Sequence, residues 1–295
     1  MKVVEYNHRY ESREDEIFKP MPIGDVHIGS RGLDEDLWHK TLEFAKKENR
    51  PIIGMGDYGE FISKDDRRHD YAGVSFKYLT PDQQYKKVRD DLMEVRDQII
   101  CLLAGNHEYT YWMRNGIDWA NWLAAELGVP YCPDFAYIKV RFHRDSGNVG
   151  GRHIFNMLAH HGWTNARTDG YKIKVIHDMK QVFPDCHIYL MGHVHRLGEA
   201  LPTSHLWIDN SNNIREFTQR YFFTGSFVKN YEAGDKRDED LFPFSNYAAR
   251  KGYPPTMLGS PLLYVRPNRV DGRNLKNKSP FDIRYETLGW VEDGY

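Results

Sequence analysis

Five apolar runs in this chain each end in a short polar cluster that contains aspartate, asparagine or histidine. The runs lead into Asp25-Val26-His27, Gly56-Asp57, Gly105-Asn106-His107-Glu108, His160-His161-Gly162 and Gly192-His193-Val194-His195. Short apolar runs of this kind are typical of buried strands. Ligands of α/β proteins bind at the sheet edge where such strands end, so we expect the five clusters to meet there. The pattern therefore predicts an α/β fold with a metal site at one edge.

Helical patterns lie between these runs. Apolar residues recur at helical spacing over Leu33 to Lys47, from Pro81 onward, over Ile117 to Leu127 and over Gly170 to Phe183. Further strands are predicted at Phe135 to Phe142, His153 to Ala159, Cys186 to Met191 and Arg220 to Phe223. Residues 1–18 predict an irregular arm or an edge strand. The charged stretch Phe61 to Thr80 predicts a long loop, either a substrate lid or a solvated excursion.

Composition is ordinary for a globular protein, with 40% hydrophobic and 28% charged residues among 295. The net charge of −2 gives no global basic field, although a nuclease with a local basic groove remains compatible with it. Three cysteines without metal-like spacing argue against a disulfide framework and a zinc ribbon. No apolar signal region or run of ~20 apolar residues is present, which predicts a cytoplasmic protein that does not bind membranes. We expect one domain over residues 1–295, with 241–295 as a C-terminal elaboration.

One competing motif overlaps the second cluster. Gly54-Met55-Gly56-Asp57-Tyr58-Gly59 fits the G-x-G-x-x-G pattern of dinucleotide sites and follows a strand. A carboxylate inside a phosphate-binding loop would repel the pyrophosphate, so Asp57 is better explained as a ligand of a cation.

The donor set predicts the kind of metal centre. It comprises Asp25, His27, Asp57, Asn106, one or both of His160 and His161, His193 and His195. Imidazole, carboxylate and amide donors without a thiolate favour manganese, iron, zinc or a related ion. The set is too large for one tetrahedral zinc, and it suits two ions that share a bridging carboxylate. Such centres activate water to hydroxide at neutral pH, and phosphate esters are their natural substrates.

The order D-x-H, G-D-x-x-E, G-N-H-E, H-H-G and G-H-x-H resembles the calcineurin-like metallophosphoesterase superfamily. The motifs span residues 24 to 195, and the Thr224-Gly225-Ser226 turn resembles a further family feature. The resemblance implies a four-layer α/β/β/α sandwich of two mixed sheets flanked by helices. It also implies a phosphoesterase that uses two divalent metal ions, with manganese favoured over iron, zinc, nickel or magnesium.

The resemblance implies roles for single residues. Asp25, His27 and His195 would hold the first metal, Asn106, His193 and a histidine of the His160-His161 pair the second, and Asp57 would bridge them. His160 is favoured as the ligand, with His161 as the alternative. His107 would be the catalytic residue beside the leaving oxygen. Glu108 would not bind a metal itself but would orient His107 or a neighbouring metal ligand.

Other features bear on the substrate. Glu60 departs from the motif of the protein phosphatases, and Asp25-Val26-His27-Ile28-Gly29 resembles the double-strand-break repair nuclease branch instead. Aromatic residues from Tyr109 to Trp112 and a basic C-terminal cluster also slightly favour a phosphodiester, either DNA, RNA or a nucleotide. That cluster comprises Arg266, Arg269, Arg273, Lys276 and Lys278. The alternatives are a phosphomonoesterase or protein phosphatase, and a non-catalytic metal-binding scaffold module.

Overall fold

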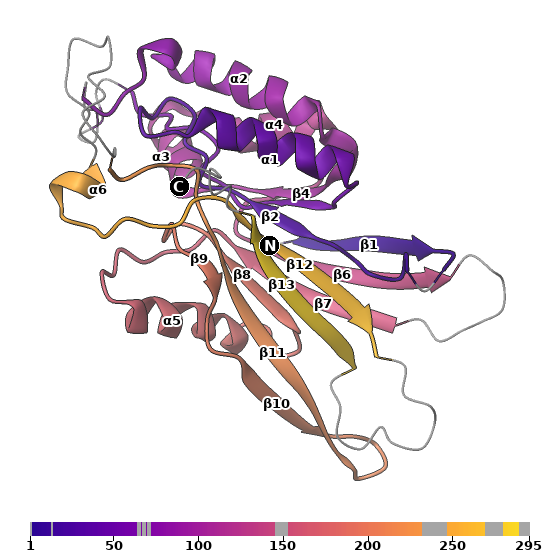
Figure 1. Cartoon of the computed structure of the whole chain (residues 1–295). Helices are drawn as coiled ribbons and strands as arrows, with labels where there is room; N and C mark the ends of the chain where they lie inside the picture. Colours follow the sequence, from indigo (N-terminus) through magenta and orange to yellow (C-terminus); the bar gives the residue numbers. More distant parts are fainter. Residues whose placement is uncertain are drawn as a thin grey trace, which may run out of the picture.

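Two sheets packed face to face form the centre of the molecule, and helices cover their outer faces (Figure 1). The computed structural model describes residues 2–12, 14–63, 66, 69, 72–144, 153–231, 247–268 and 280–288. Within the 61–80 stretch, residues 64–65, 67–68 and 70–71 lie outside these ranges.

The larger sheet contains both parallel and antiparallel pairs. Its order is β1 (Lys2–Tyr10), β6 (Phe135–Arg144), β7 (His153–His160), β8 (Ile188–Met191), β11 (Ile214–Thr224) and β10 (Thr203–Ile208). A short strand, β9 (Leu197–Glu199), also pairs with β11. β1 pairs with β6, β7 with β8 and β8 with β11 in parallel, whereas β6–β7 and β10–β11 are antiparallel. The expected edge strand at the N-terminus is therefore present as β1.

The smaller sheet has a parallel centre. It consists of β2 (Met21–Ile23), β3 (Ile52–Gly54), β4 (Ile99–Leu103) and β5 (Tyr131–Cys132). The antiparallel hairpin of β12 (Ser260–Pro267) and β13 (Phe281–Leu288) extends this sheet beside β2. Phe18 and Val265 exchange two backbone hydrogen bonds of 2.9 and 2.8 Å there. The layer formed by the parallel sheet and this hairpin therefore contains both parallel and antiparallel pairs.

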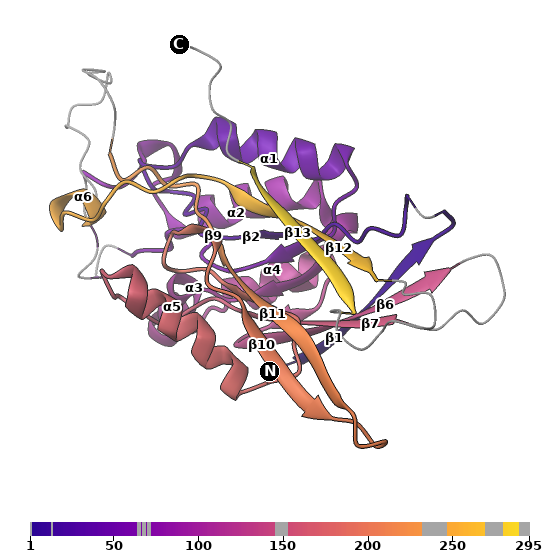
Figure 2. The same cartoon turned by 60° about the horizontal axis from the view of Figure 1, so that its bottom comes forward.

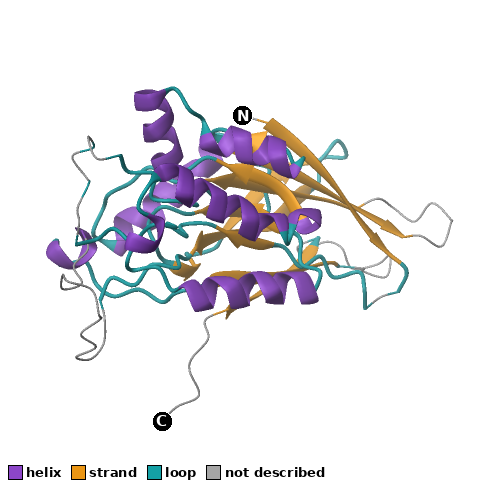
Figure 3. Ribbon diagram, turned by 90° about the horizontal axis from the view of Figure 1, so that it is seen from above, coloured by secondary structure: helices purple, strands orange, loops and turns teal. Residues whose placement is uncertain are grey.

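Three apolar clusters separate the four layers. The middle cluster fills the space between the sheets with residues such as Ile53, Leu103, Ile138 and Phe222. An outer cluster joins the smaller sheet to α1 (Glu35–Lys47), α2 (Pro81–Met93) and α4 (Trp119–Leu127). The other outer cluster joins the larger sheet to α5 (Asp169–Asp178) on the opposite side of the molecule. This arrangement confirms the predicted α/β/β/α sandwich, and Figure 3 shows helices over the sheet seen from above.

Local sequence explains where the helices begin and end. Asp34 accepts a 3.0 Å hydrogen bond from the backbone N–H of Leu37, so α1 begins just inside the predicted segment. Gly128 adopts a left-handed conformation directly after α4 and stops it. Short 3-10 helices occupy Phe76–Tyr78, Arg96–Gln98 and Met179–Gln181.

Two helices were not expected from the sequence. α3 (Asn106–Asn115) starts inside the third polar cluster, and the short α6 (Tyr247–Arg250) precedes the C-terminal hairpin. Among the described residues, every helix is too short or too polar to cross a lipid bilayer.

Candidate metal centre

The five polar clusters meet at one edge of the two sheets. Three groups of side chains there each bring their ligand atoms within 4.8 Å of one another. The groups are Asp25, His27 and His195; His27, Asp57 and His107; and Asp57, His161 and His193. Because His27 and Asp57 each belong to two groups, the three form one continuous site.

Asp25, His27 and His195 make up the first group. The Nε2 atoms of His27 and His195 lie 3.2 Å apart, and Nε2 of His195 lies 3.4 Å from Oδ1 of Asp25. Nε2 of His27 is 3.9 Å from the same Asp25 oxygen. Two imidazole nitrogens and one carboxylate oxygen therefore face a common point.

Asn106 adds its amide to the group of Asp57, His161 and His193, which we call the second group from here on. Oδ1 of Asn106 lies 2.7 Å from Nδ1 of His193 and 3.1 Å from Nε2 of His161. Nε2 of His161 lies 3.2 Å from Oδ2 of Asp57. The same Asp57 oxygen is 3.7 Å from Nε2 of His27. Asp57 thus stands between the two groups, as a bridging carboxylate would.

The spacing of these atoms fits a metal ion in each group. Atoms bonded to one ion at ~2.0–2.2 Å lie roughly 3.0–3.5 Å from each other. Most of the nitrogen and oxygen contacts above fall in or near this range. Neutral imidazole, carboxylate and amide oxygen are also ligands that divalent transition metals accept.

The structure brings His161, and not His160, to the sheet edge where the candidate ligands meet, which we call the metal edge. His160 accepts a 2.8 Å hydrogen bond from the N–H of Gly162 through Nδ1, and its ring packs on Phe135 and Trp163. Side chains alternate along a strand. Ala159 faces the middle cluster, and Leu158 faces α5 on the other side of the sheet. His160 lies two residues after Leu158, so its side chain is also on the α5 side and points away from the metal edge. The placement therefore corrects the preference for His160 in favour of the alternative.

A backbone contact fixes the tautomer of His161. Its Nδ1 lies 2.8 Å from the carbonyl oxygen of Met55 and is buried. Nδ1 is therefore a donor, so that Nε2, the atom beside Asp57 and Asn106, is the nitrogen with the lone pair once the ring is neutral.

Backbone strain is concentrated at this edge. Five residues of the site have φ between +50° and +65°, a region that side chains other than glycine seldom adopt: Asp25, His27, Asp57, His193 and His195. Such strain persists only where surrounding contacts enforce it, and it is commonly stored at functional sites.

Two glycines leave room for the carboxylates. A Cβ on Gly105 would lie 2.0 Å from Oδ1 of Asp57, and one on Gly192 would lie 2.7 Å from Oδ2 of Asp25. Only glycine permits this approach of strand ends to ligand side chains.

Glu108 holds the strand ends together rather than the imidazole of His107. Its carboxylate accepts backbone N–H bonds from Asp57 (3.0 Å), Tyr58 (2.8 Å) and Gly105 (2.8 Å). Burial and the charge of Asp57 raise the pKa of Glu108 to about 7. Glu108 therefore orients Asp57 through the main chain.

Glu60 is the residue whose role the sequence did not indicate. Its carbonyl oxygen lies 2.6 Å from Nδ1 of His107, and its carboxylate lies 3.4 Å from that nitrogen. The other carboxylate oxygen is 3.6 Å from Nδ1 of His27. Glu60 thus fixes the ring of His107 and borders His27. The sequence marked this position only as a departure from the phosphatase motif.

The electrostatics of the site favour anionic aspartates. Burial alone would raise the pKa of Asp57, but the charges of His161 and His107 hold it well below its ordinary value. Burial and the charge of His107 lower the pKa of His27 strongly. Burial opposes protonation of His161 as well, yet the charge and hydrogen bond of Asp57 raise its pKa to about 10.

The turn after β11 supports the first group. Ser226 donates a 2.9 Å hydrogen bond from Oγ to the carbonyl oxygen of Asp25, and the N–H of Phe227 donates to the same oxygen at 3.1 Å. The N–H of His193 donates to both carboxylate oxygens of Asp25, at 3.1 and 2.9 Å. Asp25 is thereby held by two other strand ends.

No protein-family model and no curated protein matches the chain. Distant similarity exists to solved structures. GAP50, the anchor in the inner membrane complex of Plasmodium, is 13% identical, with 94% of this chain and 87% of that chain covered and a TM-score of 0.46. Vps29 of Entamoeba histolytica is 12% identical, with 92% and 99% covered and a TM-score of 0.37. An uncharacterized protein of Streptococcus pneumoniae TIGR4, a predicted phosphoesterase, is 11% identical, with 92% and 90% covered and a TM-score of 0.33. These likenesses are too distant to assign a family, so the function has to be inferred from the site itself.

Proposed function

We propose that this protein is a phosphoesterase that hydrolyses phosphate esters with two divalent metal ions, manganese being favoured. The observation that carries the proposal is the pair of donor groups joined at Asp57, with neighbouring ligand atoms 2.7 to 3.9 Å apart. Two adjacent ions suit an in-line displacement at phosphorus.

Each ion has a complete set of proposed ligands. Asp25, His27 and His195 would hold the first, and Asn106, His161 and His193 the second, with Asp57 shared. When bound, the ions supply the positive charge that polarises the ester and lowers the pKa of water.

A residue of the chain itself, His107, would protonate the leaving group. His107 lies at the start of α3, where the helix terminus favours an anionic phosphate. The contact of Nδ1 with the carbonyl oxygen of Glu60 leaves Nε2 as the atom that would carry a proton toward the departing oxygen. The Glu60 carboxylate, 3.4 Å from the ring, would stabilise the protonated form.

A phosphodiester of nucleic acid or a nucleotide is our preferred substrate, as in the double-strand-break repair nuclease branch. Tyr109 and Trp112 project from α3, 54% and 41% exposed, with ring centroids 5.9 Å apart. Exposed aromatic rings beside a phosphate site can stack on bases. Of the basic C-terminal cluster, Arg266 is in β12, whereas the other four residues lie outside the described ranges.

The test is turnover of bis-p-nitrophenyl phosphate and p-nitrophenyl phosphate by the manganese-loaded protein. We expect release of nitrophenolate, faster from the diester, and none from Asp57→Asn. Bound metal without turnover of either ester would contradict the enzyme and support a scaffold. Faster turnover of the monoester would contradict the preference for phosphodiesters.

A further inference from the structure

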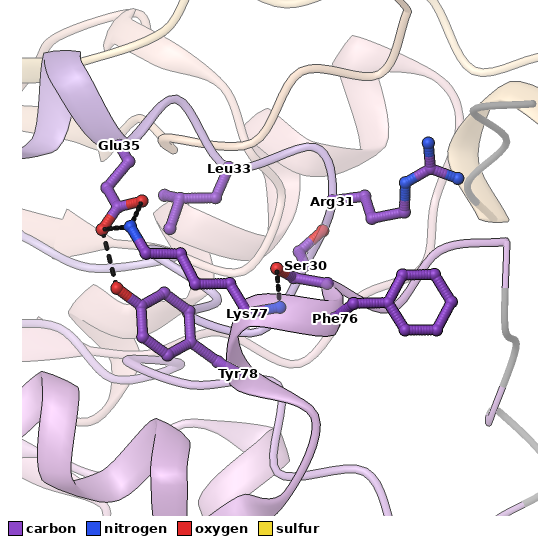
Figure 4. A pocket seen from close by; sticks show the side chains of 8 residues that line it. Ser30, Arg31, Leu33, Glu35, Phe76, Lys77 and Tyr78 are labelled. Atoms are coloured by element: carbon purple, nitrogen blue, oxygen red, sulfur yellow. Dashed lines mark hydrogen bonds and ion pairs between the residues drawn. The ribbon is translucent and has the colours of Figure 1, made fainter. Parts of the chain in front are cut away.

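Two cavities at the surface differ in whether their charged groups have partners. The first, of about 220 Å³, lies between the loop at Ser30 and the 3-10 helix Phe76–Tyr78 (Figure 4). Nζ of Lys77 donates to both carboxylate oxygens of Glu35, at 2.7 and 3.0 Å, and the Tyr78 hydroxyl donates to one of them at 2.9 Å. The Glu35, Lys77 and Tyr78 groups in this cavity therefore satisfy one another.

The second cavity, of about 240 Å³, lies between α5, β9 and the segment at Thr256 and Met257; we call it the α5–β9 cavity. Two of the residues that line it, Arg196 and Leu197, directly follow the predicted ligand His195 in the sequence. Figure 1 shows α5 and β9 near one another below the chain that follows α6. The cavity is therefore close to the metal edge along the chain but separate from the proposed ligands.

Lys172 lines this cavity with a charge that is poorly compensated. Its side chain is only 7% exposed. Within the described part of the chain its nearest acidic partner is Oδ1 of Asp169, at 3.8 Å, which is too long for a hydrogen bond. Asp169 in turn pairs with Arg196. A largely buried side chain whose ammonium group has its acidic partner only at 3.8 Å is weakly compensated, so an anion bound in the cavity would stabilise it.

A second donor in the lining has no acceptor. The Oγ1 atom of Thr256 is buried and has no hydrogen-bond partner in the described structure. Buried hydroxyl groups are normally hydrogen-bonded, and an exception calls for an explanation. Lys172 thus offers a weakly compensated cation, and Thr256 a hydroxyl group without a partner, to the same cavity.

The acidic groups of the lining do not fill this need. The carboxylate of Glu199 is held by Arg220 through contacts of 2.5 and 2.6 Å, and that of Asp169 by Arg196. Burial and the charge of Arg196 outweigh the charge of Asp169 and lower the pKa of Lys172, and a bound anion would raise it again.

We propose that the α5–β9 cavity binds a phosphate group, with Lys172 as its cation and the Thr256 hydroxyl as a hydrogen-bond donor. This inference deepens the proposed function and rests on it for the choice of phosphate among anions. The phosphate has two possible sources: the phosphate next to the scissile one in the substrate, or a free phosphate ion. Ile173, Leu197 and Phe223 add apolar lining that suits the carbon skeleton of a substrate.

The first test compares two substrates that differ by one phosphate, the thymidine dinucleotide dTpdT and its 5′-phosphorylated form, with manganese-loaded full-length protein. We expect the extra phosphate to raise kcat/KM for cleavage of the diester about tenfold or more, the scale of a charge-assisted hydrogen bond. Lys172→Met should remove this gain, and Lys172→Arg should restore most of it. Lys174→Met is the matched control, because Lys174 is on the same helix, is 62% exposed and pairs with Asp178.

The second test counts bound inorganic phosphate by equilibrium dialysis. One more phosphate bound by wild type than by Lys172→Met, with equal kcat/KM for both dinucleotides, would support the site for free phosphate. Equal dinucleotide rates together with equal phosphate counts would overturn the proposal. If wild type turns over neither the dinucleotides nor the nitrophenyl esters, the proposed function fails, and the dialysis still decides on the cavity. Should Lys172→Met lose its native circular dichroism, Thr256→Val takes its place in both tests.

Discussion

His107 illustrates how single contacts prepare a residue for chemistry. Its backbone N–H donates to Oδ1 of Asp57 at 2.9 Å, and its ring is fixed by the main chain of Glu60. The same carboxylate that would bridge the metals therefore positions the start of α3. A residue held at both backbone and ring can meet the leaving oxygen in one orientation.

His107→Ala should retain metal and slow the release of poor leaving groups most. The reason is that a general acid matters more as the leaving group becomes more basic. We expect a loss of roughly a hundredfold or more with an alkyl phosphoester and a smaller loss with nitrophenyl esters. Rates across a leaving-group series, with metal content by elemental analysis, check this. Equal losses across the series would exclude the acid role.

The neighbouring histidines 160 and 161 give a matched pair of variants. His161→Ala should lower the metal affinity by more than the ten- to hundredfold typical of outer-shell residues, because Nε2 lies between Asp57 and Asn106. His160→Ala removes a ring that packs on Phe135 and should leave metal content unchanged. Elemental analysis of both proteins decides, and the reverse result would restore His160 as the ligand.

Protonation of His161 couples metal binding to pH. In the metal-free fold its pKa is about 10, above its ordinary 6.5, so its protonation stabilises that fold below pH 6.5 and this contribution is lost as pH rises through 10. A ligand imidazole must be neutral, so metal binding releases this proton. Burial lowers the pKa of His27 and of His193, which are already neutral. We expect metal affinity to rise by up to about tenfold per pH unit between pH 7 and 9.

Calorimetry in two buffers with different protonation enthalpies measures this release. At pH 8 about one proton should be released to the buffer for each metal-loaded protein. The apparent binding enthalpies in the two buffers should therefore differ by about the difference between the protonation enthalpies of the buffers, and this difference should shrink in His161→Ala. Equal enthalpies in both buffers with the wild-type protein would contradict the coupling.

The sequence revealed which strand ends carry ligands but not how each side chain is aimed. The family resemblance favoured His160, whereas alternation along β7 favours His161 once the faces of Leu158 and Ala159 are known. The function of Glu60 was hidden for a different reason. It acts partly through its carbonyl oxygen, and a backbone contact leaves no trace in residue identity.

At the scale of elements, the predicted strands and helices were those with a strong burial pattern. β4 is apolar and buried along its whole length, and α1 buries one face against the sheet. α3 was missed because Glu108 is its only buried residue, so it lacks apolar periodicity. The outer half of β10 and β11 projects from the body with Leu206, Ile208 and Ile214 exposed (Figure 2), and an exposed hairpin offers little pattern to recognise.

The turn after β8 is an element whose geometry depends on one glycine. In Gly192→Ala the new Cβ would meet Oδ2 of Asp25 at 2.7 Å, so Asp25 must move. We expect loss of metal from the first group and at least a tenfold loss of activity, with the fold retained. Elemental analysis and thermal unfolding measure the two effects. Gly170→Ala is the control, because its Cβ would meet no atom within 4 Å, and full metal content in Gly192→Ala would refute the close approach.

On the scale of the whole molecule, β12 and β13 complete the layer that contains the smaller sheet. β12 hydrogen-bonds to Phe18, which lies near the other end of the sequence. Leu263 and Val265 are fully buried in the middle cluster, together with Phe281 of β13. The sequence suggested an elaboration for residues 241–295, because Pro, Gly and charged residues there obscure two short core strands. We propose that the sheets and this hairpin unfold as one cooperative domain.

Leu263→Ala tests that proposal. Truncation of a fully buried leucine between the sheets should lower the free energy of unfolding by about 2–5 kcal/mol, and the whole domain should lose this stability together. Leu206→Ala on the exposed part of β10 should change it by no more than about 0.5 kcal/mol. Two of the seven tryptophans, Trp38 and Trp119, are buried under the helices over the smaller sheet, so tryptophan fluorescence reports in part on this layer, while far-ultraviolet circular dichroism reports on all strands. Coincident transitions shifted equally by Leu263→Ala would establish one unit. A separate early transition in circular dichroism, with fluorescence unchanged, would instead make the C-terminal hairpin an independent addition to the fold.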